Sequence, residues 1–503
     1  MHNHQVKHQT WRLEKLPRGR KMAKSRWVCD YQFHGSEFIK AKARFVVCGY
    51  SQKEGEDYFE TFSATPRWDS VRLAIALGAQ FNLGYDMADV SAAFLYAPMK
   101  EEVYVQQPPG FEVKGSGDYT LACLLLLSLY GAKQSCCNWG GVRNDELFGL
   151  GFRQMKHDPC MFIKGEGPED PEFLIHLVHV DDSLTFGRDA ARAAFLKKWC
   201  EIFKCEVATD KFFLGCEINQ GKGFYKIDQT QYIKRLLVTH GMEECNTVAT
   251  PMEAGATFLK ATEETVLQEN IRPIVGALRY AVITRFDILT AVGIVSRHAN
   301  APTVEIVAAI KRIMRYLKGT TKFGLIYQKG KNGVSLHGYV DANFAGDIND
   351  RKSTTGLCFY LNECSNPITA MSTIQSCIAT STCHAEYMAA YKAVIFAVWC
   401  RGLLEEMGVA EDKDATRIYE DNSAAIALAE NPVNHKTTLH FAVKYFYVRE
   451  QSKAGFIRLV KIGTNDQVAD GLSKPMSKIK FDETVHCFAA NKQEEVTVRH
   501  LLE

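Results

Sequence analysis

The sequence has almost no excess of either charge, because 60 Lys and Arg residues face 58 Asp and Glu residues, for a net charge of +2. Total charge therefore does not mark the chain as a nucleic-acid binder, and any basic surface must be local. The first 53 residues are the best candidate for such a surface, since they contain "KLPRGRKMAKSR" and "KAKAR". A charge run of this kind is usually a solvated face, so by itself it excludes little.

Other common signatures are also missing. The 16 cysteines lack the paired spacing of a zinc ribbon or a disulfide framework, so we expect reduced thiols that mostly pack. The apolar run "LACLLLLSLYGA" (121–132) is too short to cross a bilayer, and no signal peptide is visible. These absences favour a soluble, intracellular protein, in the cytoplasm or nucleus, without a membrane partner.

The length of 503 residues, with 46% hydrophobic and 23% charged residues, predicts about three folded domains. Helical and strand-like patterns alternate in 1–215, whereas 216–332 is mainly helical. In 333–476, three strand-like runs precede a long helix at 382–407, after which strands and helices alternate. Residues 477–503 are expected to form a C-terminal tail. The order of elements predicts an α+β multidomain protein.

Two adjacent carboxylates, Asp181 and Asp182, lie between two apolar, β-branched runs that predict a hairpin. A solvated turn is the simple explanation, because Asp is favoured in turns. A divalent metal is the alternative, because it relieves the repulsion between carboxylates. Two-metal phosphoryl transfer also needs a third acid, and Asp89 interrupts an apolar strand in "YDMADVSAAFL".

A second set of acids is spread over 333–476, one on each of four expected elements. Taken singly, each is more often a surface acid or a helix cap. Together, four acids from four elements are what two-metal hydrolysis of a phosphodiester requires. The members of this set are Asp341, Glu386, Asp421 and Asp470.

The local contexts of these acids recur with other motifs in a fixed order. From about residue 11 to about 485, the chain resembles the reverse transcriptase–ribonuclease H part of a Ty1/copia-type retrotransposon Pol polyprotein. The motifs that carry the resemblance are "KARFVVCGYSQKEGEDYFETFS", "DVSAAFL", "EEVYVQQPPGF", "LYGAKQS", "DPCMFIK", "HVDD", "FFLGCEI", "YLKGT", "GYVDANFAGDINDRKSTTG", "AEYMA", "EDNSAAIAL" and "VADGLSKPM".

The resemblance implies a right-hand polymerase, with fingers and palm in 1–215 and a helical thumb and connection in 216–332. A ribonuclease H-like α/β domain in 333–476 would follow. Each active site would hold two Mg²⁺ (or Mn²⁺) ions on the acids named above. The implied activities are RNA-directed DNA synthesis and cleavage of RNA in RNA–DNA hybrids. The implied partners are an RNA template, a DNA primer, the RNA–DNA hybrid and deoxynucleoside triphosphates.

The resemblance also implies residues that handle the nucleotide. Lys42 and Arg44 match the fingers strand that contacts the triphosphate. Phe94 would lie under the sugar and exclude a 2′-hydroxyl. The "LYGAKQS" motif is expected near the nucleotide and template, through Gly131, Lys133 and Gln134.

The chain departs from the family pattern without losing any of the seven acids. His179 replaces the Tyr before Val-Asp-Asp, and a Pro-Arg pair and a Lys are also missing, as are two acids of the C-terminal region. The residues at those other positions are Cys136 and Cys137, Leu126 or Leu127, His384 and Ala442. An inactive, truncated remnant that folds and at most binds nucleic acid is therefore the alternative to an active enzyme. A stand-alone nuclease is a third interpretation. Protease, zinc-knuckle and integrase signatures are not found, which suggests a truncated frame or one part of a processed polyprotein.

Overall fold

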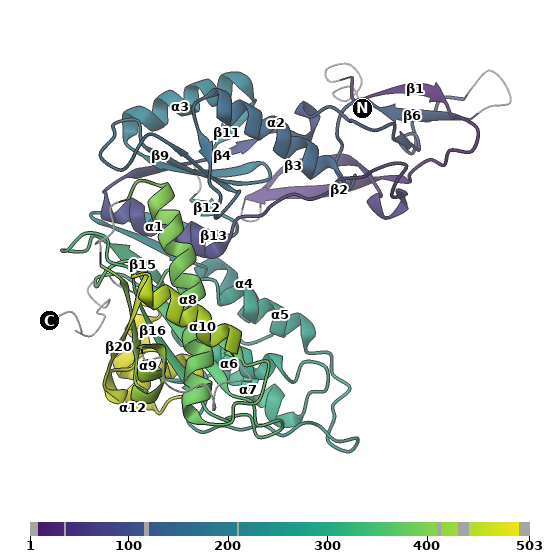
Figure 1. Cartoon of the computed structure of the whole chain (residues 1–503). Coiled ribbons are helices and arrows are strands. Elements are labelled where there is room, and N and C mark those ends of the chain that lie inside the picture. Colours follow the sequence, from purple (N-terminus) through teal and green to yellow (C-terminus); the bar gives the residue numbers. More distant parts are fainter. Residues whose placement is uncertain are drawn as a thin grey trace.

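A computed structural model describes residues 9–34, 37–114, 120–208, 211–409, 414–430 and 442–491. The chain forms a series of mixed α and β layers, with the N-terminal strands at one end and the C-terminal domain at the other (Figure 1). This arrangement confirms the predicted α+β multidomain class.

The N-terminal region is built from strands. The expected hairpin around residue 35 is present as β2 and β3, which pair antiparallel. A separate three-stranded sheet has the order β1-β6-β5, and the apolar run near residue 121 supplies its central strand. These strands are β1 (Trp11–Lys15), β2 (Ser25–His34), β3 (Glu37–Val47), β5 (Tyr104–Val105) and β6 (Leu121–Leu125).

A six-stranded antiparallel sheet follows, in the order β11-β4-β10-β9-β8-β7. Alternate residues of its strands enter two different cores, as the two-residue period of a strand requires. Leu177 packs on the side of helix α1 (Trp68–Gln80), whereas Val178 packs with α2 (Ser135–Gly149) and α3 (Asp189–Ile202). The strands are β4 (Gly84–Val90), β7 (Arg153–Gln154), β8 (Met161–Lys164), β9 (Leu174–His179), β10 (Asp182–Gly187) and β11 (Cys205–Val207).

The middle of the chain is helical, as expected, but it also contributes to a sheet. Strand β15, which follows the helices, returns to pair with β14, which precedes them, and completes a four-stranded sheet. The helices are α4 (Thr230–Thr239), α5 (Arg272–Ala281), α6 (Leu289–Ser296) and α7 (Val304–Gly319). The strands are β12 (Phe212–Phe213), β13 (Cys216–Gly221), β14 (Phe224–Asp228) and β15 (Gly324–Gln328).

The C-terminal sheet has the order β18-β17-β16-β19-β20. Its first three strands pair antiparallel, as expected, and β16, β19 and β20 pair parallel. The elements are β16 (His337–Asn343), β17 (Thr354–Tyr360), β18 (Thr369–Ile374), α8 (Thr382–Glu406), β19 (Thr416–Glu420), α9 (Ser423–Glu430), α10 (Ala442–Lys453) and β20 (Ile457–Lys461). Among the described residues, α8 alone is long and apolar enough to cross a membrane. It is the core helix of this domain, packed on β16, β17 and β19.

The chain after β20 differs from expectation. The helix expected from about residue 465 is reduced to the short α11 (Asp470–Ser473). Part of the expected tail is folded, because α12 (Lys478–Thr484) packs Phe481 into the core of the middle helices, and Ala490 pairs with Gly324. Residues 492–503 and the side chain of Ala442 lie outside the described residues.

The C-terminal domain packs against the region of the six-stranded sheet. The indole of Trp399 donates a 3.0 Å hydrogen bond to the carbonyl of His157, and the guanidinium of Arg67 lies 4.2 Å from the centre of the Trp399 ring. Arg72 on α1 donates a 2.6 Å hydrogen bond to the carbonyl of Ile368. One continuous apolar core joins the two parts, so they form one packed unit.

The middle helices enclose a fully buried ion pair. Arg285 contacts both carboxylate oxygens of Asp287, at 2.9 and 2.6 Å, and neither side chain is exposed. Tyr316 donates a 2.6 Å hydrogen bond to the same carboxylate, and Arg285 also donates to the carbonyl of Thr320. Every charge in this network therefore has a partner.

We expect Asp287→Asn to destabilise the protein by about 3–5 kcal/mol, because it leaves the buried guanidinium without its counter-charge. Chemical denaturation followed by circular dichroism measures this. Glu253→Gln is the matched control, since it breaks an ion pair with Arg312 in which the Glu253 side chain is 74% exposed. Equal effects of the two variants would contradict the importance of the buried pair.

Candidate functional site

The three acids of the N-terminal half lie where two neighbouring interior strands of the six-stranded sheet, β4 and β10, end and begin. Asp182 on β10 is the direct cross-strand partner of Asp89 on β4, and Asp181 occupies the turn that precedes β10. The backbone N–H of Val90 donates a 3.1 Å hydrogen bond to the carbonyl of Asp181. Burial raises the pKa of Asp89, and the nearby charges of Asp181 and Glu206 raise it further. The register therefore places Asp89 and Asp182 on neighbouring strands, with Asp181 in the adjoining turn, and a shared metal site for the three stays a prediction.

Glu206 is an acid that the sequence reasoning missed. It is the cross-strand partner of Asp89 on the other side, in the three-residue edge strand β11. Nothing in "KCEVATD" indicates a strand that pairs with β4, because so short a segment has no readable period. Asp89 therefore faces an acid on both neighbouring strands.

Two cations of the β2–β3 hairpin approach these acids. Lys42 lowers the pKa of Asp89, in opposition to its acidic neighbours. Burial raises the pKa of Tyr130 to about 12, the Asp181 charge acts in the same direction, and Arg44 acts against both. Lys42 and Arg44 are two residues apart on β3, so their side chains lie on the same face.

Phe94 and Gly131 lie in segments next to the acids. Phe94 lies in the short helix η3 (Ala93–Tyr96), is 7% exposed, and its ring meets Tyr130 edge-on at 4.6 Å. Gly131 has a φ of +86°, and a Cβ at this position would lie 2.1 Å from the carbonyl oxygen of Val47. Only glycine therefore allows this loop to lie against β3.

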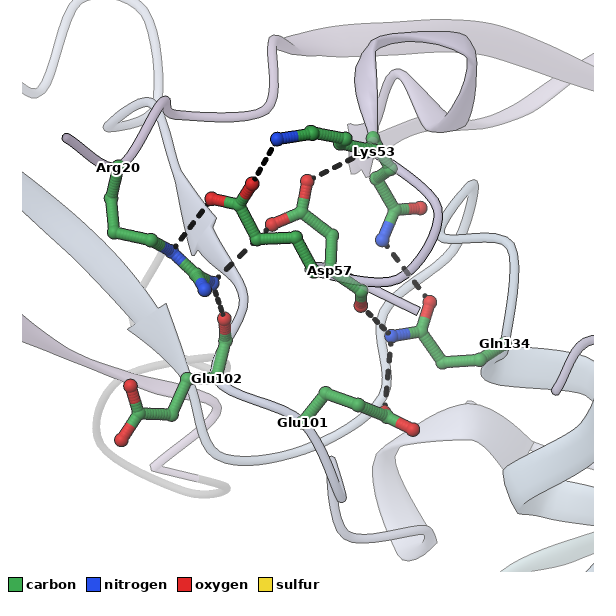
Figure 2. A network of polar contacts seen from close by, with 8 residues as sticks. Arg20, Lys53, Asp57, Glu101, Glu102 and Gln134 are labelled. Carbon is green, nitrogen blue, oxygen red and sulfur yellow. Dashed lines mark hydrogen bonds and ion pairs between the residues drawn. The ribbon is translucent and has the colours of Figure 1, made fainter. Parts of the chain in front are cut away.

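Gln134 is fully buried and holds a loop in place (Figure 2). Its amide donates to the carbonyl of Asp57 at 2.8 Å and to Glu101 at 3.3 Å, and its oxygen accepts a 3.1 Å hydrogen bond from Gln52. Asp57 in turn accepts a 2.8 Å hydrogen bond from the backbone N–H of Lys53. These contacts use the Gln134 side chain within the protein, so its position supports the loop rather than offering a free group to a nucleotide.

Lys133 is exposed but also makes contacts within the protein. Its ammonium donates a 2.7 Å hydrogen bond to the Tyr58 hydroxyl, and its backbone N–H donates to Gln52 at 2.8 Å. The loop at 52–58 and the "LYGAKQS" motif are thus joined through both backbone and side chains.

Three of the four C-terminal acids converge. Asp341 on β16, Glu386 on α8 and Asp421 after β19 each offer an oxygen, and these oxygens lie within 4.8 Å of one another. Asp341 and Glu386 are 6% and 7% exposed. Burial raises the pKa of Asp341 to about 6, although a hydrogen bond from Ser473 lowers it. Such carboxylates together favour a bound cation.

The fourth acid, Asp470, lies beside this group but outside it. It is 3% exposed and ion-paired with Lys474 and Lys480. Its charge raises the pKa of Asp341, and Ser473, in the same short helix, donates a hydrogen bond to Asp341. Asp470 is therefore paired with two lysines and is not part of the group formed by the other three acids.

Glu420 is a second acid that the sequence reasoning missed. It is fully buried next to Asp421, and one of its oxygens accepts a 2.9 Å hydrogen bond from the N–H of Asn422. The other oxygen has no hydrogen-bond partner, and neither does one oxygen of Glu386. Burial and the Glu420 charge raise the pKa of Glu386. Strand alternation in "RIYED" could have indicated that Glu420 points away from Tyr419 and inward.

The residues that replace family motifs keep structural partners. Cys136 is half-buried at the start of α2, where burial and then the Asp181 charge raise its pKa. His384 is buried in the first turn of α8, and its N–H donates to the hydroxyl of Ser381, the N-cap. His179 is half-buried at the end of β9, opposite Asp182.

Comparison with known proteins agrees with this geometry. Residues 8–254 match the family described as reverse transcriptase (RNA-dependent DNA polymerase). Over 491 residues the chain is 34% identical to the retrovirus-related Pol polyprotein from transposon TNT 1-94 of Nicotiana tabacum, covering 95% of this chain and 36% of that protein. The chain belongs to the copia-type retrotransposon Pol family. The polyprotein from transposon RE2 of Arabidopsis thaliana is 34% identical over 95% of this chain and 33% of its own length. The copia-type chain thus spans about a third of the length of these relatives.

A solved structure described as the foamy viral protease-reverse transcriptase dRH in complex with double-stranded DNA shares the fold. Its TM-score is 0.50 at 12% identity, over 92% of this chain and 68% of that chain. At this identity the likeness concerns the fold alone. The copia-type chain therefore has the fold expected of a right-hand polymerase followed by a ribonuclease H-like domain.

The donor sets fit divalent cations. Families of this kind generally use divalent metals, and hard cations such as Mg²⁺ prefer carboxylate oxygens of the kind assembled at the C-terminal site. One oxygen of Glu386 and one of Glu420 are buried without a hydrogen-bond partner, so neither oxygen is committed to a donor within the protein. Asp341, Glu386 and Asp421 are the residues that would hold a cation there.

We expect Asp341→Asn to raise the thermal midpoint at pH 8 by about 2–4 °C without divalent metal. The raised pKa means that the folded state binds more protons than the unfolded state between about pH 4 and 6. The stability of the parent therefore falls as the pH rises through that window. Asp341→Asn has no carboxyl group at this position, so its stability does not fall for this reason. The same variant should lose the part of the Mg²⁺ stabilisation that comes from the C-terminal site.

Differential scanning fluorimetry at pH 5 and pH 8, with and without Mg²⁺, measures both effects. Asp482→Asn, at an exposed acid of α12, is the control and should change neither. A parent whose midpoint does not respond to Mg²⁺ at pH 8 would contradict an assembled cation site.

Proposed function

We propose that the copia-type chain is an RNA-directed DNA polymerase with a ribonuclease H domain. The observation that carries the proposal is the pair of acid clusters, one on the six-stranded sheet and one on the C-terminal sheet, each drawn from separate elements. Like charges placed opposite each other cost stability, so a fold that does this at two sites favours cation-dependent chemistry at both.

At the polymerase site, Asp89, Asp181 and Asp182 would hold two Mg²⁺ or Mn²⁺ ions. Bound ions would supply activation of the primer 3′-hydroxyl and neutralisation of the triphosphate. Lys42 and Arg44, on one face of β3, would bind the triphosphate of the incoming deoxynucleotide. Phe94 would lie under the sugar, and its buried ring would exclude a 2′-hydroxyl.

At the nuclease site, Asp341, Glu386 and Asp421 would hold cations at the scissile phosphate of RNA in an RNA–DNA hybrid. Asp470 would act beside them. Its lysine partners, Lys474 and Lys480, are cations at the rim that could meet the phosphate backbone. RNA template and DNA primer would bind along the surface between the two sites.

The second candidate is an inactive remnant that folds and at most binds nucleic acid. The observation that favours it is the pair Cys136 and Cys137, which stands where the family has a Pro-Arg pair, and Cys136 is close enough to Asp181 for the acid to raise the pKa of its thiol. Losing a planar guanidinium removes a fixed cation from the nucleotide region. All seven acids nevertheless remain, which favours the enzyme.

We expect Asp181→Asn with Asp182→Asn to abolish primer extension on an RNA template while leaving hybrid cleavage intact. Asp341→Asn should do the reverse. Each change removes several kcal/mol of metal-dependent stabilisation of the transition state, or roughly a thousandfold in rate. Gel assays with labelled primer and labelled RNA in the same reaction, with Mg²⁺ or Mn²⁺, measure both activities.

Extension and cleavage in the parent, each lost in its own variant, would support the proposal. Absence of both activities in a folded parent would point to the remnant. Hybrid cleavage without extension would instead identify a stand-alone nuclease.

A further inference from the structure

The turn that carries the polymerase acids has an unusual backbone. The β9–β10 ladder closes on the pair His179 and Asp182, so Val180 and Asp181 form a two-residue hairpin loop. Val180 has a φ of +58°. A positive φ at the first central residue is the pattern of a type II′ turn, which normally has glycine there. A β-branched residue in this conformation is strained, so neighbouring groups must hold it.

Two hydrogen bonds from outside the hairpin hold this turn. The indole N–H of Trp139 donates a 2.6 Å hydrogen bond to the carbonyl of Val180, and the N–H of Val90 donates to the carbonyl of Asp181. The two donors come from α2 and from the end of β4. Together they fix the peptide groups on both sides of the Asp181 α-carbon.

Trp139 is itself held rigidly. It is 1% exposed in the apolar core between α2, α3 and the sheet, and its ring meets Phe203 edge-on at 5.1 Å. A phenylalanine could fill most of this space. What tryptophan adds is the indole N–H, and a buried indole N–H usually requires an acceptor.

We propose that Trp139 is a positioning residue for DNA synthesis, holding the Val180–Asp181 peptide so that the Asp181 carboxylate faces Asp89. The inference rests on the proposed polymerase function. Without the indole donor, this peptide can rotate to relieve the strain at Val180. Such a rotation changes φ of Asp181 and so redirects the carboxylate that would hold a cation.

The chain offers a matched control in Trp199. It lies on α3 in the same apolar core, is also 1% exposed, and its indole nitrogen has no hydrogen-bond partner. Trp139→Phe and Trp199→Phe therefore remove the same atoms from the same core. Only Trp139→Phe removes a hydrogen bond to the acidic turn.

Three measurements on the full chain test the inference. Trp139→Phe should lower kcat for primer extension by about tenfold to a hundredfold, as misplacement of a reacting group does, with KM for the deoxynucleotide changed by less than about threefold. Hydrogen exchange of peptides that cover 174–187 should become faster. Mn²⁺ affinity, measured in the Asp341→Asn background, should fall. Trp199→Phe should change none of the three beyond about twofold.

Equal losses of rate in the two variants, in step with their thermal midpoints, would overturn the inference and assign Trp139 to packing alone. Unchanged exchange and Mn²⁺ affinity in Trp139→Phe would also overturn it. If the parent extends no primer, the proposed function fails. A selective loss of Mn²⁺ affinity and faster exchange in Trp139→Phe would then still support the positioning role.

Discussion

The antiparallel pairing of β4 with β10 is the constraint on which the polymerase half depends. Its register places Asp89 directly opposite Asp182, and β11 adds Glu206 on the other side of Asp89. Like charges opposite each other in a sheet are destabilising. Another interaction must therefore maintain this register despite the repulsion between the acids. Slipping it by one residue would move every apolar side chain of β10 to the wrong face, including Leu184 and Phe186. The apolar residues of β10 thus fix the register that places the acids opposite each other.

The C-terminal site also places carboxylates close together, so repulsion between like charges arises there as well. Three of its acids come from a strand, a long helix and a strand end, and two of them are almost completely buried. Burial raises the pKa of Asp341 and Glu386, which reduces the repulsion only by keeping protons on the acids. A bound cation removes the repulsion while leaving the oxygens ionised. The arrangement of the three acids therefore favours a bound cation.

How much the sequence could predict depended on how local each signal was. Seven acids of the two sites were recognisable because each lies in a short motif, whereas Glu206 and Glu420 were missed, and the helices and hairpins follow from local periodicity. The β14–β15 pairing was missed because its strands are far apart in the chain, and nothing local specifies the partner. Gln134 was assigned to the nucleotide from its motif, but its burial depends on Asp57 and Gln52, which belong to another segment. The folding of α12 depends likewise on a distant apolar surface.

The stability that offsets these two sites comes from a core that both domains share. Residues of α1, such as Leu73, belong to one apolar cluster with residues of α8 and β16, such as Ala393 and Val340. Net stability of a domain is a small difference between large terms, so two buried acid clusters are tolerable only where much apolar area is buried around them. Trp399 and Arg72 add polar contacts across the same junction. Because the core is continuous, the two domains share much of the apolar burial that offsets the repulsion at these sites.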